Sequence, residues 1–272
     1  MKDEGTRFTG SVPEIYHRHL GPLLFEPYAR DLARRLAPFA RPGLRVLEIA
    51  AGTGILTRHL VTALPGAALC ATDLAEPMLE IAQRHVGPRE GIEWRPADAV
   101  SLPFPDESFD LVTCQFGVMF FPDKDAAARE VRRSLRPGGR FVLNVWDSLE
   151  ANPLGRIPHE TIGSFFPADP PGFYRIPFGY HDPAAARDLL ERAGFANVRT
   201  EHVPLVAEAP TAEHAAIGLV QGSPVLSAIL ERGGVAPETI VAAVAAALAR
   251  EHGDRPLRAT MKAWVVSAER PV

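Results

Sequence analysis

The sequence predicts an α/β protein built on a doubly wound, mostly parallel sheet of seven strands, with the last strand antiparallel. Short apolar runs of strand character alternate with stretches of helical apolar spacing between residues 45 and 146. The first run ends in a turn with two glycines, and strand and helix signals return after a Pro-rich segment. Repeated βα units of this length place consecutive strands parallel, with helices on both faces of the sheet.

The expected elements follow in chain order. Residues 11–38 have the apolar spacing of one or two amphipathic helices, which prolines such as Pro22 are expected to cut into short pieces. The expected strands are residues 45–50, 67–72, 92–95, 109–115, 140–146, 198–207 and 258–268. The expected helices of the first half are residues 55–64, 76–85 and 124–135, and a Pro-Gly-Gly turn at residues 137–139 leads into the fifth strand.

The second half departs from this rhythm. Residues 148–180 are rich in Pro, Gly and aromatic residues and are expected to form an insertion. A helix then begins with Asp182 as its N-cap and ends before Gly194. Residues 208–256 are expected to be mostly helical. Such insertions are expected to cap the carboxyl ends of the strands, where open α/β sheets bind their ligands.

The length of 272 residues suits one large domain, or one domain with a cap. The expected division is an N-terminal helical lid at 1–40, a core at 41–147, a cap insertion at 148–180, a core helix and strand at 181–207, a helical cap insertion at 208–256 and a final core strand at 257–272.

Composition narrows the class of partner. The net charge is −4 and no Lys/Arg cluster is longer than two residues, so no nucleic-acid partner is expected. The longest apolar run, residues 240–249, is about half of a membrane span. Residues 1–10 lack the apolar core of a secretory signal. Cys70 and Cys114 lie in apolar stretches, which suits buried free thiols in a reducing compartment. We therefore expect a cytoplasmic protein, and no cluster has the spacing of metal ligands.

The turn after the first strand is the most informative segment. Val-Leu-Glu-Ile-Ala-Ala-Gly-Thr-Gly at residues 46–54 leads an apolar run into a turn with small side chains. Gly52 and Gly54 have no Cβ, so a ligand can approach the backbone before the next helix begins. A dinucleotide fingerprint has a third glycine where this chain has Thr57. A tight βα turn without a ligand remains the alternative.

Two carboxylates follow the next two strands. Asp73 ends the second strand about twenty residues after the turn, where a carboxylate can accept both hydroxyls of a ribose. Asp98 and Ala99 follow the third strand, where a carboxylate beside a backbone N–H can read an adenine edge. The alternatives are a helix N-cap for Asp73 and a plain loop position for Asp98. Asp106 and Glu107 are expected to be solvated turn residues.

These segments together resemble the motifs of Rossmann-like S-adenosylmethionine-dependent methyltransferases. The resemblance rests on residues 46–54, on Ala-Thr-Asp-Leu-Ala-Glu-Pro-Met-Leu at 71–79, on Asp98 with Phe-Asp-Leu-Val at 109–112, and on Leu-Arg-Pro-Gly-Gly-Arg at 135–140. It covers residues 45–146 and is strongest to the small-molecule methyltransferases of ubiquinone/menaquinone biosynthesis. One departure is Ala50, where the common first motif has a glycine.

The resemblance implies that the cofactor is S-adenosylmethionine and assigns it a set of binding residues. Asp73 would hold the ribose hydroxyls, and Asp98 with Ala99 would hold the adenine edge. The other implied residues are Leu74 and Met78 on the ribose or adenine side, Ala50, Gly52 and Gly54 at the methionine part, Glu48 in support of the turn, and Gln115 with Phe116 beside the sulfonium.

The implied reaction is an in-line displacement at the methyl carbon, in which the protein mostly aligns the nucleophile. A base is needed only if the nucleophile arrives protonated, and His19 and His181 are the first candidates. Tyr16 is a candidate for orienting cofactor or substrate. The candidate substrate lining is Met119, Phe120, Trp146 and Tyr174. The alternative for each histidine is a polar surface or N-cap residue, and for each aromatic a core residue.

The function expected from all of this is methyl transfer to an oxygen, nitrogen or carbon nucleophile of a small, partly apolar metabolite. A cofactor-binding partner or sensor protein without catalysis remains open. An NAD(P)-dependent oxidoreductase on the same sheet is disfavoured by the missing third glycine. The sequence leaves the oligomeric state open between a monomer and a homodimer.

Overall fold

The computed structural model describes residues 12–89 and 91–272, so the first residues of the expected N-terminal lid lie outside the described part. The chain divides into two compact units. The helical unit comprises Met1–Tyr28, Asp147–Gly179 and Pro204–Lys262, and the sheet unit comprises Ala29–Trp146, Tyr180–Val203 and Ala263–Val272.

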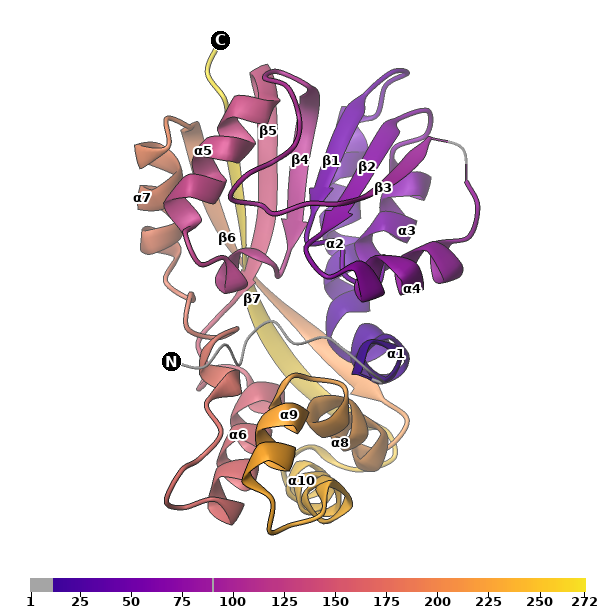
Figure 1. The fold of residues 1–272 in the computed structure, drawn as a ribbon, viewed down its shortest axis with the longest axis vertical. Helices are drawn as coiled ribbons and strands as arrows, with labels where there is room; N and C mark the ends of the chain where they lie inside the picture. The colour runs from indigo at the N-terminus through magenta and orange to yellow at the C-terminus, as the bar shows by residue number, and fades with distance from the viewer. Residues whose placement is uncertain (1–11, 90) are drawn as a thin grey trace. The chain divides into compact units, whose positions relative to one another are not determined.

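A seven-stranded sheet organises the sheet unit, and its order is β3-β2-β1-β4-β5-β7-β6 (Figure 1). The strands are β1 Arg45–Ile49, β2 Ala68–Asp73, β3 Ile92–Pro96, β4 Phe109–Gln115, β5 Leu135–Trp146, β6 Ala196–Ala209 and β7 Leu257–Glu269. The neighbouring pairs from β3 to β5 are parallel, and β7 is antiparallel to β5. The predicted fold class is confirmed.

The centre of the sheet explains where a ligand can bind. β1 is paired with β2 on one side and β4 on the other, so the strand order reverses between β1 and β4. Val46 and Leu47 of β1 and Leu111 and Val112 of β4 are buried, as expected for strands covered on both faces. Ligands of open α/β sheets bind at such a reversal, beyond the carboxyl ends of the strands.

Helices flank the sheet on both sides (Figure 1). On the sheet unit they are most of α2 Glu26–Leu36, η2 Ala37–Phe39, α3 Ile55–Ala63, α4 Glu76–Val86, η3 Val118–Phe120, α5 Lys124–Ser134 and α7 Pro183–Arg192. The Asp182 side chain caps α7 by accepting from the Ala184 N–H, and Gly194 after the helix has φ 87°, both as predicted.

The helical unit consists of α1 Val12–Ile15, η1 Tyr16–Phe25, α6 Pro153–Phe165, η4 Phe173–Arg175, α8 Ala212–Gln221, α9 Val225–Arg232 and α10 Pro237–His252. α8 packs against α10 and η1, and α10 packs against α6. Gly218 of α8 permits this packing, because a Cβ there would lie 2.8 Å from the Cβ of His19.

Two local predictions were wrong. Pro22 does not interrupt the N-terminal helix, because η1 is a wider π-helical stretch that continues through it. β5 begins at Leu135 rather than after the Pro-Gly-Gly turn, and these residues form an irregularity in its pairing with β4.

Candidate functional site

The two positions Gly52 and Gly54 in the turn after β1 favour glycine for different physical reasons. Both have positive φ, 57° at Gly52 and 78° at Gly54, which favours glycine. A Cβ on Gly54 would lie 3.0 Å from side-chain atoms of Ala82 and Val86, so Gly54 allows α3 to begin close to α4. A Cβ on Gly52 would meet only Met78 Cε at 3.8 Å. Open space for a ligand therefore lies at Gly52. Gly54 instead lets α3 and α4 pack closely together.

Ala50 has φ 55°, in the left-handed region that glycine adopts more easily. Its methyl group lies against Gly117, where a Cβ would come within 2.5 Å of Ala50 Cβ and 2.8 Å of Cys114 Sγ. The turn after β1 and the turn after β4 thus fit each other, with alanine on one side and glycine on the other.

Glu48 is buried in β1 and joins that strand to α3. Its carboxylate accepts hydrogen bonds from the Thr57 hydroxyl (2.7 Å) and the Thr57 backbone N–H, near the amino end of α3. Burial raises the pKa of Glu48 to about 8, although both bonds from Thr57 oppose this. Thr57 therefore stands where a dinucleotide fingerprint has its third glycine, and its hydroxyl donates a hydrogen bond to the buried Glu48.

Asp73 at the end of β2 contacts the glycine turn directly. Its Oδ2 accepts from the Gly52 N–H (2.8 Å) and its Oδ1 from the Ala75 N–H (2.9 Å). Burial raises the pKa of Asp73, and the N–H donors of Ala75, Gly52 and Leu74 oppose the rise. The N-cap of α4 is Ala75, so Asp73 is not the cap residue. A carboxylate has about four acceptor sites, so with these three donors it retains capacity for a further donor.

The two apolar residues after Asp73 differ in exposure. Leu74 is 65% exposed, which is unusual for a leucine next to a half-buried carboxylate. Met78 in α4 is buried, with its Cε facing the open side of Gly52.

Asp98 and Ala99 lie in the loop between β3 and β4. Asp98 is exposed, and its Oδ1 accepts from the Val100 N–H (3.0 Å), while Ala99 is buried. Asp106 and Glu107 of this loop are exposed turn residues, as predicted. Each also has a partner: Asp106 accepts a hydrogen bond from Arg133, and Glu107 accepts one from Arg270.

The end of β4 brings together a residue predicted for the cofactor and one predicted for the substrate. Phe116 follows Gln115 with φ 53°, and its ring stacks on Trp146 at 3.7 Å between centroids. The backbone N–H of Phe116 donates to Asn144 Oδ1 (3.0 Å). Asn144 was missed from the sequence, although a polar residue inside the apolar run of β5 was a usable signal.

A lysine fastens the turn that follows. η3 contains the predicted substrate residues Met119, which is buried, and Phe120. Lys124 Nζ donates to the carbonyl oxygens of Met119 (3.2 Å) and Phe121 (2.9 Å), and it lies 5.4 Å from the centre of the Tyr180 ring. Burial lowers the pKa of Lys124. No sequence signal distinguished this lysine from a solvated one at the start of a helix.

The remaining predicted residues lie elsewhere in the chain. His181 is exposed in the sheet unit, just before α7. Tyr16, His19 and Tyr174 belong to the helical unit. There Tyr16 stacks on Phe25, and the buried Tyr174 donates its hydroxyl hydrogen to the Leu219 carbonyl (2.7 Å).

His19 has a defined tautomer in the helical unit. Its Nδ1 lies 3.1 Å from the backbone carbonyl oxygen of His214, and the two rings are 4.1 Å apart. Because a carbonyl oxygen only accepts, this hydrogen bond requires a proton on Nδ1. Burial lowers the pKa of His19, and the nearby His214 and Arg18 lower it further.

Over residues 12–89 and 91–272, no group of three or more His, Cys, Asp or Glu side chains is placed to hold a metal ion. In the same part of the chain, none of the helices combines the length and apolar character needed to cross a membrane.

Comparison with known proteins agrees with this geometry. Residues 47–143 match the model of a methyltransferase domain family. A demethylmenaquinone methyltransferase of Thermus thermophilus is 46% identical over 117 residues, which are 42% of this chain and 50% of the relative. A ubiquinone/menaquinone biosynthesis C-methyltransferase of Burkholderia cenocepacia is 42% identical over 117 residues, 40% of this chain and 48% of the relative. The matched segment thus spans about half the length of these relatives.

Solved structures match over more of the chain at lower identity. The YcgJ protein of Bacillus subtilis has a TM-score of 0.59 and 20% identity, covering 90% of this chain and 99% of that one. The phosphoethanolamine N-methyltransferase 2 of Haemonchus contortus, solved with S-adenosylhomocysteine, has a TM-score of 0.64 and 18% identity, covering 98% of this chain and 58% of that one. These matches support the fold. Together with the family match they confirm the predicted resemblance: residues 47–143 match a methyltransferase domain family and are similar to the corresponding segment of the ubiquinone/menaquinone biosynthesis enzymes.

Proposed function

We propose that this protein is an S-adenosylmethionine-dependent methyltransferase that acts on a small, partly apolar metabolite. The observation that carries the proposal is the junction of Asp73 with Gly52. A half-buried carboxylate with remaining acceptor capacity lies beside a glycine whose Cβ position is open, at the reversal of the strand order. Both residues belong to the segment that matches the methyltransferase family.

The residues present fit a nucleoside with an amino-acid tail. Asp73 offers remaining acceptor capacity for the ribose, and the exposed Leu74 offers an apolar face beside it. The open side of Gly52 suits the methionine part. Among the described residues, Asn144 Nδ2 beside Phe116 is buried without a hydrogen-bond partner, which leaves a donor in that region.

The bound cofactor would supply a methyl group on a positively charged sulfur, already activated for displacement. The chain's own residues would then mainly orient the two reactants. The stacked Phe116 and Trp146 rings with Met119 offer an apolar, polarisable wall, which favours a substrate with apolar parts. If the acceptor arrives protonated, the candidate bases are His181 of the sheet unit and His19 of the helical unit. Burial lowers the pKa of His19, which favours its neutral form.

Binding of S-adenosylhomocysteine, measured by calorimetry, tests the cofactor assignment. The variant Asp73→Asn should weaken the affinity by about a hundredfold or more, since each charge-assisted hydrogen bond contributes roughly 1.5–3 kcal/mol. Asp188→Asn, at an exposed position of α7, is the matched control and should bind like the unmodified protein. Equal affinities of the Asp73 and Asp188 variants would contradict the ribose assignment.

Catalysis needs its own experiment. A panel of phenols, amines and enolates with S-adenosylmethionine should reveal a methylated product. Tight cofactor binding without turnover of any member would favour the alternative of a cofactor-binding partner or sensor protein. The free buried thiols Cys70 and Cys114 fit a reducing compartment, so we also propose a cytoplasmic location.

A further inference from the structure

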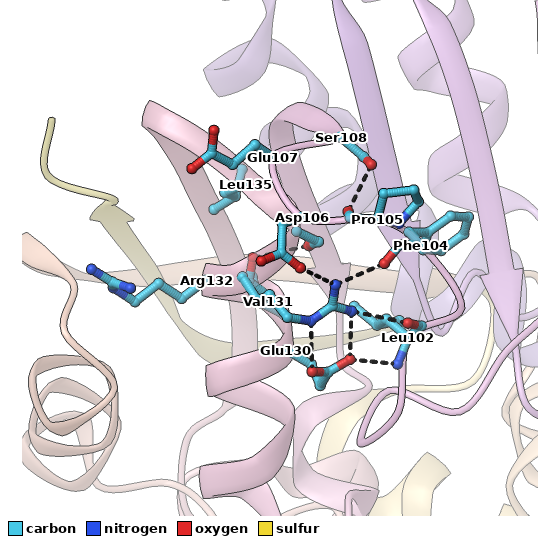
Figure 2. Close-up of polar contacts among 12 residues, drawn as sticks. Leu102, Phe104, Pro105, Asp106, Glu107, Ser108, Glu130, Val131, Arg132 and Leu135 are labelled. Atoms are coloured by element: carbon cyan, nitrogen blue, oxygen red, sulfur yellow. Dashed lines mark hydrogen bonds and ion pairs between the residues drawn. The ribbon is translucent and has the colours of Figure 1, made fainter.

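The loop between β3 and β4 depends on one arginine of α5. β3 and β4 are not neighbours in the sheet, so the chain between them runs past two other strands. Arg133 Nε and Nη2 donate to the two carboxylate oxygens of Glu130 (2.9 and 2.8 Å). Its Nη2 also donates to the Leu102 carbonyl (3.0 Å), and its Nη1 to the Phe104 carbonyl (2.7 Å) and Asp106 Oδ1 (2.8 Å). Figure 2 labels Glu130, Asp106, Leu102 and Phe104 and draws these bonds as dashed lines.

These contacts use the whole hydrogen-bonding capacity of the side chain. A guanidinium has five N–H donors in one plane, and five bonds are formed. A lysine, with three donors on a rotating ammonium, cannot reproduce this planar pattern. The arginine therefore specifies one loop geometry.

Glu130 completes the hold on Leu102. Its Oε2 accepts from the Leu102 backbone N–H (2.8 Å) while Arg133 binds the Leu102 carbonyl, so both backbone groups of this buried residue are fixed by one ion pair. Arg133 in turn holds the pKa of Glu130 below its usual range.

Further hydrogen bonds connect Leu102 to Asp98 and Ala99, the residues proposed to bind the adenine. The Ser101 N–H donates to the Asp98 carbonyl (3.1 Å), and Asp98 and Ser101 form an isolated β-bridge. The Val100 N–H fixes the Asp98 carboxylate (3.0 Å). Only three residues separate Asp98 from the fixed Leu102. Val100 and Ser101 both donate to Asp98, and Ala99 lies between Asp98 and these two residues.

We propose that Arg133 and Glu130 are positioning residues that set the base selectivity of the cofactor site. They fix Leu102 and so hold the Asp98 carboxylate and the Ala99 N–H at the spacing that matches the amino group and ring nitrogen of adenine. This inference rests on the proposed function. A hypoxanthine base has a carbonyl group in place of the amino group, so it presents an acceptor where the Asp98 carboxylate needs a donor.

The test compares S-adenosylhomocysteine with S-inosylhomocysteine by calorimetry, which gives a ratio of two affinities. The unmodified protein should favour the adenine compound by at least about tenfold, because a hypoxanthine presents a carbonyl oxygen to the Asp98 carboxylate and loses that hydrogen bond. Arg133→Met should lower this ratio by about tenfold, mainly through loss of affinity for the adenine compound. In an Asp98→Asn background, Arg133→Met should lower the ratio no further.

Arg129→Met, an exposed arginine on the same helix, is the matched control and should keep the ratio of the unmodified protein. If Arg133→Met does not fold, Glu130→Gln decides, because it weakens the same hold while keeping an acceptor oxygen. A selectivity ratio unchanged in the folded variant, even with both affinities lower, would overturn the positioning role. Absence of S-adenosylhomocysteine binding by the unmodified protein would instead overturn the proposed function itself.

Discussion

Single atoms decide how the two turns at the candidate site fit together. Ala50 adopts a glycine-like backbone conformation, and Gly117 leaves room for its methyl group. Gly117 is therefore constrained by a residue far from it in sequence. The sequence could identify Ala50 as a departure from the motif, but it could not identify Gly117 as its complement, because that contact exists only after β1 and β4 pair.

Gly117→Ala should destabilise the protein by about 1–3 kcal/mol, because the new Cβ would overpack the space beside Ala50 and Cys114. Urea unfolding measures the change. Gly163→Ala in α6 is the control with the opposite sign, since its Cβ would meet nothing nearer than 3.7 Å and alanine favours a helix. Similar effects of both substitutions would refute the fit between the turns.

Glu48 should give the stability a pH dependence with an unusual sign. The folded state keeps its proton up to a pKa of about 8, whereas the unfolded chain loses it near the ordinary value of 4.5. Folding therefore takes up a proton between these values, and the contribution of this group to stability falls as pH rises from about 5 to 8.

Glu48→Gln removes this titration and should flatten the decline, whose slope from one group is at most about 1.4 kcal/mol per pH unit. Urea unfolding of both proteins at several pH values measures the difference. The exposed Glu80→Gln is the control and should retain the slope. Parallel curves for the unmodified protein and the Glu48 variant would show that Glu48 is ionised in the fold.

At the scale of elements, the short turn η3 depends on Lys124 for its position. The ammonium group holds two carbonyl oxygens at the end of this turn, next to a small apolar cavity of about 20 Å³ bordered by Val118, Phe121 and Tyr180. The lysine thus acts as a cap for a turn too short to be stable by itself.

Lys124→Met should loosen η3 without unfolding the sheet, because methionine fills similar space but donates no hydrogen bond. Amide hydrogen exchange at Phe120 and Phe121, whose N–H groups bond within the turn, should accelerate by about tenfold or more. The amides of β1 serve as the internal control. Equal protection of η3 in both proteins would show that the ammonium is dispensable for the turn.

Most helices and strands could be predicted from the sequence, but the roles of some side chains could not. All seven strands were predicted. The apolar runs of β1 and β4 reflect burial on both faces, whereas β6 and β7 largely alternate buried and more exposed residues. Helix ends were predictable where a local signal sets them, as at Asp182. The roles of Arg133 and Lys124 were not predictable. An ion pair at helical spacing and a lysine near a helix start also occur on solvent-exposed helices, where they hold no loop. Both side chains also bind backbone carbonyls, which carry no sequence signal.

At the scale of the whole molecule, the two cysteines report on cooperative stability. Cys70 in β2 and Cys114 in β4 are buried, and burial raises the pKa of each thiol to about 12. Because the thiolate is the reactive form, labelling requires that the strands around it open.

Ellman's reagent at pH 8 should label far fewer than two thiols per native chain, and both after unfolding in urea. S-adenosylhomocysteine should slow the labelling of Cys114 further, since this residue contacts the Gly117 position beside Phe116. A Cys70→Ser variant isolates Cys114. Rapid labelling of the native protein, or a rate of Cys114 labelling unaffected by the ligand, would contradict this arrangement.

The place of β7 determines when the sheet becomes complete during synthesis. β6 is made before β7, yet β7 lies between β5 and β6. While residues 210–256 emerge from the ribosome, β5 has an unpaired edge and β6 has no strand to join. An unpaired edge is a site where another nascent chain can add. The nascent chain is therefore most exposed to aggregation late in translation. Residues 257–269 then remove the exposed edge by pairing with both β5 and β6.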